Sequence, residues 1–150
     1  MNANSPLYVD TSCLLKLIFL EPESANVIHT LSGVDPVVVS ELARLEAETQ
    51  LRARFVGGLL TKSRYQRISE ELARTLSREP FVVTAFPLDA FDGARKIAEK
   101  AKVHCRTLDL LHVGAMATLG LERLFTNDRT QGKLARSLGF SVMSPSGPDE

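Results

Sequence analysis

Short apolar runs alternate along this chain with longer segments whose apolar residues recur at helical spacing. The runs contain mainly valine, leucine and phenylalanine, a composition typical of buried strands. They predict strands at 7–9, 37–39, 81–86, 123–126 and 140–143. The segments between them predict helices at 13–20, 22–31, 41–56, 62–76, 89–102, 108–119 and 129–138. Strands that alternate with helices in this way indicate an α/β domain with a parallel sheet.

The predicted helices begin and end at residues that helix termini favour. Thr11 or Ser12 can cap the first helix, and Ser40 can cap the helix at 41–56. Gly139 is placed to end the helix at 129–138. The apolar residues at helical spacing on 41–56 are expected to form its buried face: Leu42, Leu45, Ala47, Leu51 and Phe55.

The length of 150 residues suits one domain, and no repeat or linker divides the chain. We therefore expect a single domain over 1–150, with a flexible tail from about residue 144. The formal net charge is zero, which argues against a nonspecific nucleic-acid coat protein. Cys13 and Cys105 lack the spacing of a zinc site, and we interpret both as buried small residues.

The first residues do not form a basic region followed by an apolar run, so no signal peptide is predicted. The apolar stretches are also too short to cross a bilayer. We expect a cytoplasmic protein that makes no use of a membrane.

Four acidic side chains are candidates for one site. Asp10 and Asp128 each follow a predicted strand, and ligands of open parallel sheets bind beyond the carboxyl ends of the strands. Asp109 falls in the first turn of a helix, and Glu46 lies within the second turn of the helix that follows Ser40. The four positions are therefore expected to meet at one edge of the sheet.

Each acid also has a purely structural interpretation. Asp10 can initiate a turn, Asp109 can interact with a helix dipole, and Asp128 can cap the helix that follows it. Glu46 has acidic neighbours on the same helix, and most helical glutamates face solvent. No single acid is therefore evidence of a functional site. The hypothesis rests on the expected meeting of all four acids at one edge of the sheet.

Converging carboxylates repel one another unless a cation lies among them. Ligands that are all oxygen favour Mg²⁺ or Mn²⁺ over zinc. Such an ion can activate a water molecule and neutralise the charge of a phosphodiester in the transition state. This chemistry suits phosphodiester hydrolysis.

Three segments resemble the PIN-domain nucleases, especially the VapC-type toxins of toxin–antitoxin pairs. They are YVDTSCLLKL near the start, VVVSELARLEAE in the middle and RTLDLLHVGAMATLGLERLFTNDRTQGKLARSLGFSV near the end. The middle segment places a serine six residues before a glutamate, and this register selects Glu46 over Glu41. The resemblance spans nearly the whole chain.

This resemblance implies a three-layer α/β/α fold with a central parallel sheet of about five strands. It also implies a Mg²⁺- or Mn²⁺-dependent endoribonuclease, the toxin of a type II pair, with an RNA substrate, a small antitoxin partner and a homodimeric state. Asp10, Asp109 and Asp128 carry over as metal ligands. Glu46 carries over as a ligand or as the group that orients the attacking water.

Further polar and basic residues accompany the acids. Ser12 and Thr126 match polar positions of the family and are expected to hydrogen-bond the cluster or its waters, although capping and strand-end bonding explain them equally well. Asn127 is a weaker candidate for the same role. We interpret His112 as a core or partner-facing histidine. The region from 49 to 69 carries basic residues and no acid, which makes four arginines RNA-binding candidates: Arg52, Arg54, Arg64 and Arg67.

One alternative function remains open, a PIN-like RNA- or protein-binding module with little or no nuclease activity. Without a binding function, the basic region is simply a solvated helical hairpin. The apolar faces of its two helices can equally form a dimer or antitoxin surface. Other α/β classes fit poorly. The acid pair of a receiver domain, the Asp-X-Asp of a haloacid-dehalogenase-like phosphatase and the GxGxxG of a dinucleotide-binding domain are all missing after the first strand.

Overall fold

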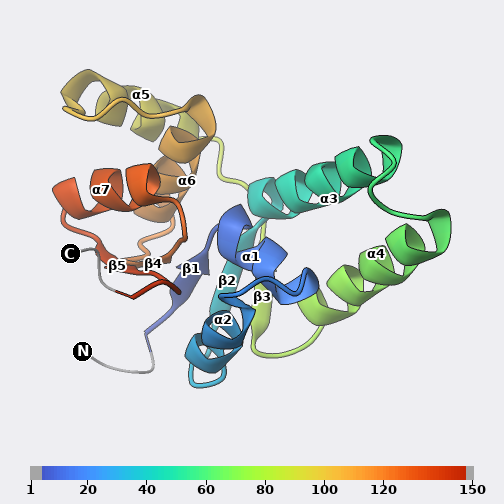
Figure 1. The fold of residues 1–150 in the computed structure, drawn as a ribbon. Helices are drawn as coiled ribbons and strands as arrows, with labels where there is room; N and C mark the ends of the chain where they lie inside the picture. Colours follow the sequence, from blue (N-terminus) through green and yellow to red (C-terminus); the bar gives the residue numbers. More distant parts are fainter. Residues whose placement is uncertain (1–4, 148–150) are drawn as a thin grey trace.

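A computed structural model of the chain describes residues 5–147, which form a five-stranded sheet with helices on both faces (Figure 1). The strands are β1 (Leu7–Val9), β2 (Val37–Ser40), β3 (Phe81–Thr84), β4 (Arg123–Phe125) and β5 (Ser141–Met143). All neighbouring pairs are parallel, in the order β3-β2-β1-β4-β5. The predicted α/β/α architecture with a central parallel sheet is confirmed.

Seven helices lie between these strands in the described part of the chain. They are α1 (Thr11–Ile18), α2 (Ser24–Leu31), α3 (Glu41–Val56), α4 (Lys62–Leu76), α5 (Ala90–Lys100), α6 (Thr107–Thr118) and α7 (Arg129–Ser137). Their ends differ from the predicted ones by at most two residues, as an amphipathic pattern with clear caps allows. No helix within residues 5–147 is long and apolar enough to cross a membrane.

Alternate residues of the strands belong to two separate cores, one on each face of the sheet. On β1, Leu7 and Val9 pack with α1, α2, α3 and α4, whereas Tyr8 packs with α6 and α7. Adjacent side chains of a strand point to opposite faces, so a strand buried on both sides must be apolar throughout. This accounts for the unbroken apolar runs in the sequence.

The order of the strands places a crevice at the carboxyl ends of β1 and β4. The chain leaves β1 for β2 and β3 on one side, and later adds β4 on the other side of β1. This reversal is the place where ligands of open parallel sheets bind. Val9 pairs with Phe125, so the residues that follow them, Asp10 and Thr126, leave the sheet side by side.

Several local predictions were wrong for identifiable reasons. The third strand ends at Thr84 and not at residue 86, because its partner β2 offers only four residues for pairing. Leu45 is 60% exposed, since the buried stripe of α3 follows Ala43, Ala47 and Leu51. The cap of α1 is Asp10, so Thr11 and Ser12 lie inside the helix.

The cysteine and tail predictions have different outcomes. Cys13 is fully buried, but Cys105 is only half-buried, because it lies in the loop that precedes α6. Flexibility of the tail from about residue 144 stays a prediction. Within the described part of the tail, Pro145 accepts a hydrogen bond from Asn26, and Ser146 donates one to Asn127.

We expect Gly114→Ala to destabilise the fold, because α5 and α6 approach closely at this residue. A Cβ atom at Gly114 would lie 2.6 Å from the carbonyl oxygen of Ala90 and 3.0 Å from the backbone nitrogen of Ala94. Overpacking of this kind lowers the free energy of unfolding by about 1–3 kcal/mol. Urea unfolding followed by circular dichroism measures the change.

Gly93→Ala on α5 is the matched control. Its Cβ would meet the Cα atom and the carbonyl oxygen of Gly114 at 3.6 Å, which is ordinary van der Waals contact. Because alanine favours helix by up to about 1 kcal/mol over glycine, we expect an unchanged or higher stability. Equal destabilisation by both substitutions would contradict the close-packing argument.

Candidate active site

Asp10 lies at the carboxyl end of β1 and caps α1, where its Oδ1 accepts a hydrogen bond from the backbone N–H of Cys13 at 3.0 Å. Thr126 donates to Oδ2 at 2.6 Å, and Ser12 donates to the same carboxylate from 2.7 Å. The residue is 4% exposed. Burial raises the pKa of the carboxyl, and the bonds from Thr126, Cys13 and Ser12 partly offset this increase.

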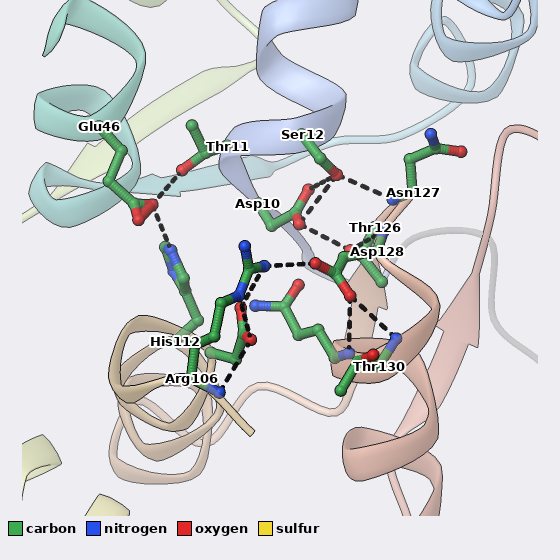
Figure 2. Close-up of polar contacts among 12 residues, drawn as sticks. Asp10, Thr11, Ser12, Glu46, Arg106, His112, Thr126, Asn127, Asp128 and Thr130 are labelled. Atoms are coloured by element: carbon green, nitrogen blue, oxygen red, sulfur yellow. Dashed lines mark hydrogen bonds and ion pairs between the residues drawn. The ribbon is translucent and has the colours of Figure 1, made fainter. Parts of the chain in front are cut away.

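Asp128 lies beyond the end of β4 and caps α7. Its Oδ1 accepts from the backbone N–H groups of Thr130 at 2.9 Å and Gln131 at 3.1 Å. The hydroxyl of Thr126 connects the two aspartates, since it donates to Asp10 and accepts from the backbone N–H of Asp128 at 3.0 Å (Figure 2). The capping interpretation therefore holds at both positions, and it is compatible with a role of both aspartates in one site.

Ser12, Thr126 and Asn127 differ in how they contact the acids. Ser12 and Thr126 donate directly to Asp10, as expected (Figure 2). Asn127 contributes its backbone N–H, which donates to Ser12 Oγ at 2.9 Å. Its side-chain oxygen instead accepts a hydrogen bond from Ser146. Asn127 thus supports the cluster through its main chain.

Arg106 bridges Asp109 and Asp128, and it was not identified from the sequence. The guanidinium Nε lies 3.0 Å from Asp109 Oδ2, and Nη2 also donates to Asp109. The same Nη2 donates to Asp128 Oδ2 (Figure 2). Asp109 itself is 5% exposed in the first turn of α6. An arginine three residues before an aspartate at a helix start was the available signal, because such a pair can meet across one helical turn.

Glu46 reaches the site from the side of α3, and two polar side chains contact its carboxylate. Thr11 Oγ1 and His112 Nε2 both lie within hydrogen-bond distance of Glu46 Oε2, the latter at 2.9 Å (Figure 2). Burial alone would raise the pKa of Glu46, but the bonds to His112 and Thr11, together with the nearby positive charge of Arg106, outweigh burial and the pKa is lowered. His112 is a core residue, as interpreted, and also contacts one of the acids.

All four acids line one cavity of about 420 Å³ at the carboxyl edge of the sheet. Gln131 lines it too, and its buried Oε1 is without a hydrogen-bond partner among the described residues. Carboxylate oxygens and an unpartnered amide oxygen are ligands that a hard divalent cation prefers, so the residues present fit such an ion. In this arrangement, however, residues 5–147 contain no group of three or more acidic, histidine or cysteine side chains already gathered to hold a metal.

Of the four arginines suggested as RNA-binding, Arg54 lines the cavity. Its guanidinium lies 3.8 Å from the centroid of the Phe19 ring and forms an ion pair with Glu21 at 3.7 Å. Arg52 lies over the rings of two neighbouring aromatic residues, Phe55 and Tyr65. Arg64 and Arg67 are exposed on α4, outside the cavity lining.

We expect Asp10→Asn to change how stability depends on pH. The folded-state pKa of Asp10 is raised above its usual value of 3.8, so its contribution is fully present below that value and is lost as pH rises through the folded pKa. The variant lacks this loss. Its free energy of unfolding relative to the parent should therefore increase from acidic to neutral pH, measured by urea unfolding of metal-free protein. A difference that is flat or falling with pH would contradict the raised pKa.

Comparison with known proteins identifies the family of this chain. A family model described as "PIN domain" matches residues 7–137. Ribonuclease VapC46 from Mycobacterium tuberculosis (strain ATCC 25618 / H37Rv) is 32% identical over 146 residues, which cover 93% of this chain and 98% of that protein.

Solved structures share the architecture at lower sequence identity. FitAcB from Neisseria gonorrhoeae superposes with a TM-score of 0.75 and 17% identity, covering 93% of this chain and 98% of that one. VapC20 from Mycobacterium tuberculosis superposes with a TM-score of 0.68 and 17% identity, covering 89% and 95% of the two chains. With the family model and the relative at 32% identity, the chain belongs to the PIN-domain family.

Proposed function

We propose that this chain is a divalent-metal-dependent endoribonuclease that hydrolyses phosphodiester bonds in RNA. One observation carries the proposal: acids from four separated elements, β1, α3, α6 and the β4–α7 junction, line a single cavity with a buried, unpartnered amide oxygen. The relative at 32% identity is named a ribonuclease, which supports the same reaction.

Asp10, Asp109, Asp128 and Glu46 are the residues that would hold Mg²⁺ or Mn²⁺. When bound, the ion would lower the pKa of a water molecule and offset charge on the phosphodiester. The chain's own residues prepare the site. Ser12 and Thr126 fix the orientation of the Asp10 carboxylate, and the cap bonds from Thr130 and Gln131 fix that of Asp128. Glu46 orients the attacking water.

The proposed partners are an RNA substrate, a small antitoxin protein and a second copy of the chain. Structures with similar folds include VapBC2 from Rickettsia felis bound to a DNA fragment from their promoter, and a toxin–antitoxin complex from Klebsiella pneumoniae. Exposed apolar side chains on and beside α3, at Leu45, Val56 and Leu59, provide area for a protein partner. These features support a toxin of a type II pair.

We expect Asp10→Asn and Asp128→Asn each to abolish RNA cleavage in the presence of Mn²⁺. Each change removes one negative charge from the proposed metal site. Asparagine caps helices about as well as aspartate, so α1 and α7 should still form. Cleavage of a fluorescent RNA measures activity, and circular dichroism verifies the fold. Chelation of divalent ions should abolish parent activity in the same assay.

Asp92→Asn is the matched control for these substitutions. Asp92 is an exposed aspartate in the first turn of α5, outside the cavity lining, so cleavage should stay at the parent rate. A folded Asp10→Asn protein that cleaves as fast as the parent would refute the assignment of the acids. A folded parent that binds RNA but never cleaves it with Mg²⁺ or Mn²⁺ would instead favour a binding module.

The arginines Arg52, Arg54, Arg64 and Arg67 are proposed to contact the RNA backbone. The Arg64→Gln/Arg67→Gln double variant should bind RNA more weakly and with a flatter dependence on salt, by about 0.7–0.9 in the log–log slope for each phosphate that is no longer neutralised. Arg54→Gln should also slow cleavage, because Arg54 lines the cavity. Fluorescence anisotropy over a salt series measures binding. Lys96→Gln on the exposed face of α5 is the control, and an effect equal to that of the double variant would contradict this RNA path.

A further inference from the structure

A chain of side-chain hydrogen bonds crosses the core and ends on Glu46. Ser40 Oγ lies 2.7 Å from the hydroxyl of Tyr8, and that hydroxyl lies 2.7 Å from His112 Nδ1. On the other side of the imidazole, His112 Nε2 lies 2.9 Å from Glu46 Oε2 (Figure 2). The chain thus begins at the cap of α3, passes through β1 and α6, and returns to α3 at the proposed site.

We propose that His112 is a positioning residue for Glu46, and that Tyr8 fixes the imidazole tautomer in which His112 donates to the carboxylate. The inference rests on the proposed function for its catalytic consequence. Its structural basis is independent of that function. Three of the groups concerned are almost completely inaccessible to solvent: Ser40 and Tyr8 at 0% exposure, and His112 at 2%.

The direction of the hydrogen bonds follows from what each group can donate. Ser40 Oγ accepts from the backbone N–H of Ala43 at 3.2 Å, which leaves its own proton for the oxygen of Tyr8. Tyr8 then donates to Nδ1, and the neutral imidazole carries its proton on Nε2, facing Glu46. The opposite order would place the lone pair of Nε2 against a carboxylate, which cannot donate when ionised.

Only one of the two carboxylate oxygens of Glu46 is hydrogen-bonded in this network. His112 Nε2 and Thr11 Oγ1 both donate to Oε2. Among residues 5–147, no hydrogen bond to Oε1 is present, so this oxygen remains for the water or ion of the reaction. A glutamate on a helix has three rotatable side-chain bonds, and fixing Oε2 restricts Oε1 to one position.

A purely structural role for His112 would predict a different response to substitution. Glutamine places an amide N–H near the position of Nε2 and can still donate to Glu46, whereas leucine cannot. If His112 only fills space, both variants should lose stability with no selective effect on turnover. If it positions Glu46, His112→Gln should keep most of the parent kcat. His112→Leu should lower kcat by about 10- to 100-fold, with the KM for RNA unchanged.

The test combines kinetics with ¹⁵N NMR of the histidine ring. In the parent at neutral pH, the His112 shifts should show a protonated Nε2 and an unprotonated Nδ1 that accepts a hydrogen bond. Tyr8→Phe removes the donor to Nδ1, so the Nδ1 shift should move toward that of a free acceptor and kcat should fall with KM unchanged. A protonated Nδ1 in the parent would overturn the proposal, even if the His112→Leu protein does not fold.

The outcomes also separate this inference from the proposed function. Parent-like kcat in a folded His112→Leu protein, together with loss of cleavage in Asp10→Asn, would overturn the positioning role and leave the nuclease standing. A parent that never cleaves RNA would refute the nuclease, while the NMR measurement would still decide the tautomer. The exposed His29 on α2 provides an internal reference for the ring shifts.

Discussion

The fold must hold several carboxylates close together at one edge of the sheet. Their mutual repulsion and burial would oppose folding unless other groups offset them. Each carboxylate accepts hydrogen bonds or ion pairs from neighbouring groups. Asp10 and Asp128 each accept backbone N–H bonds at the start of a helix, and Asp109 and Asp128 share Arg106. Hydrogen bonds to the ionised form favour it, so these donors counteract burial. Helix-capping bonds from the backbone therefore stabilise the acids of the cavity together with the side chains around them.

Topology explains why residues so distant in sequence meet. The crevice forms where the chain reverses its direction of growth across the sheet, between β1 and β4. Asp10 and Thr126 leave adjacent strands at this crevice and bond to each other. Glu46 and Asp109 arrive from helices that pack on opposite faces of the sheet, α3 and α6. The site thus joins both layers of helices, and the contact between His112 of α6 and Glu46 of α3 links the two layers directly.

The sequence predicted the fold and the meeting of the four acids at one cavity, because both follow from local patterns. Apolar runs marked every strand, and the positions of Asp10 and Asp128 after strands indicated one edge of the sheet. Rotation of a helix about its axis was harder to predict, as the exposure of Leu45 demonstrates. Contacts such as Arg106 with Asp128, or Tyr8 with His112, depend on long-range packing that no single segment encodes. The sequence gives no sign that Gln131 belongs to the cavity. Only the folded structure shows that its amide oxygen is buried without a hydrogen-bond partner among the described residues.

The double role of Asp10 and Asp128 constrains how this chain can change over generations. Most replacements at either position would remove a helix cap together with a carboxylate of the proposed site, and would damage folding and the proposed chemistry at once. Asparagine has the same shape as aspartate, preserves the cap and deletes the charge, and a single-base change in the codon produces it. One Asp-to-Asn change at either of these two helix starts is therefore a short mutational path to a folded protein that lacks the proposed activity.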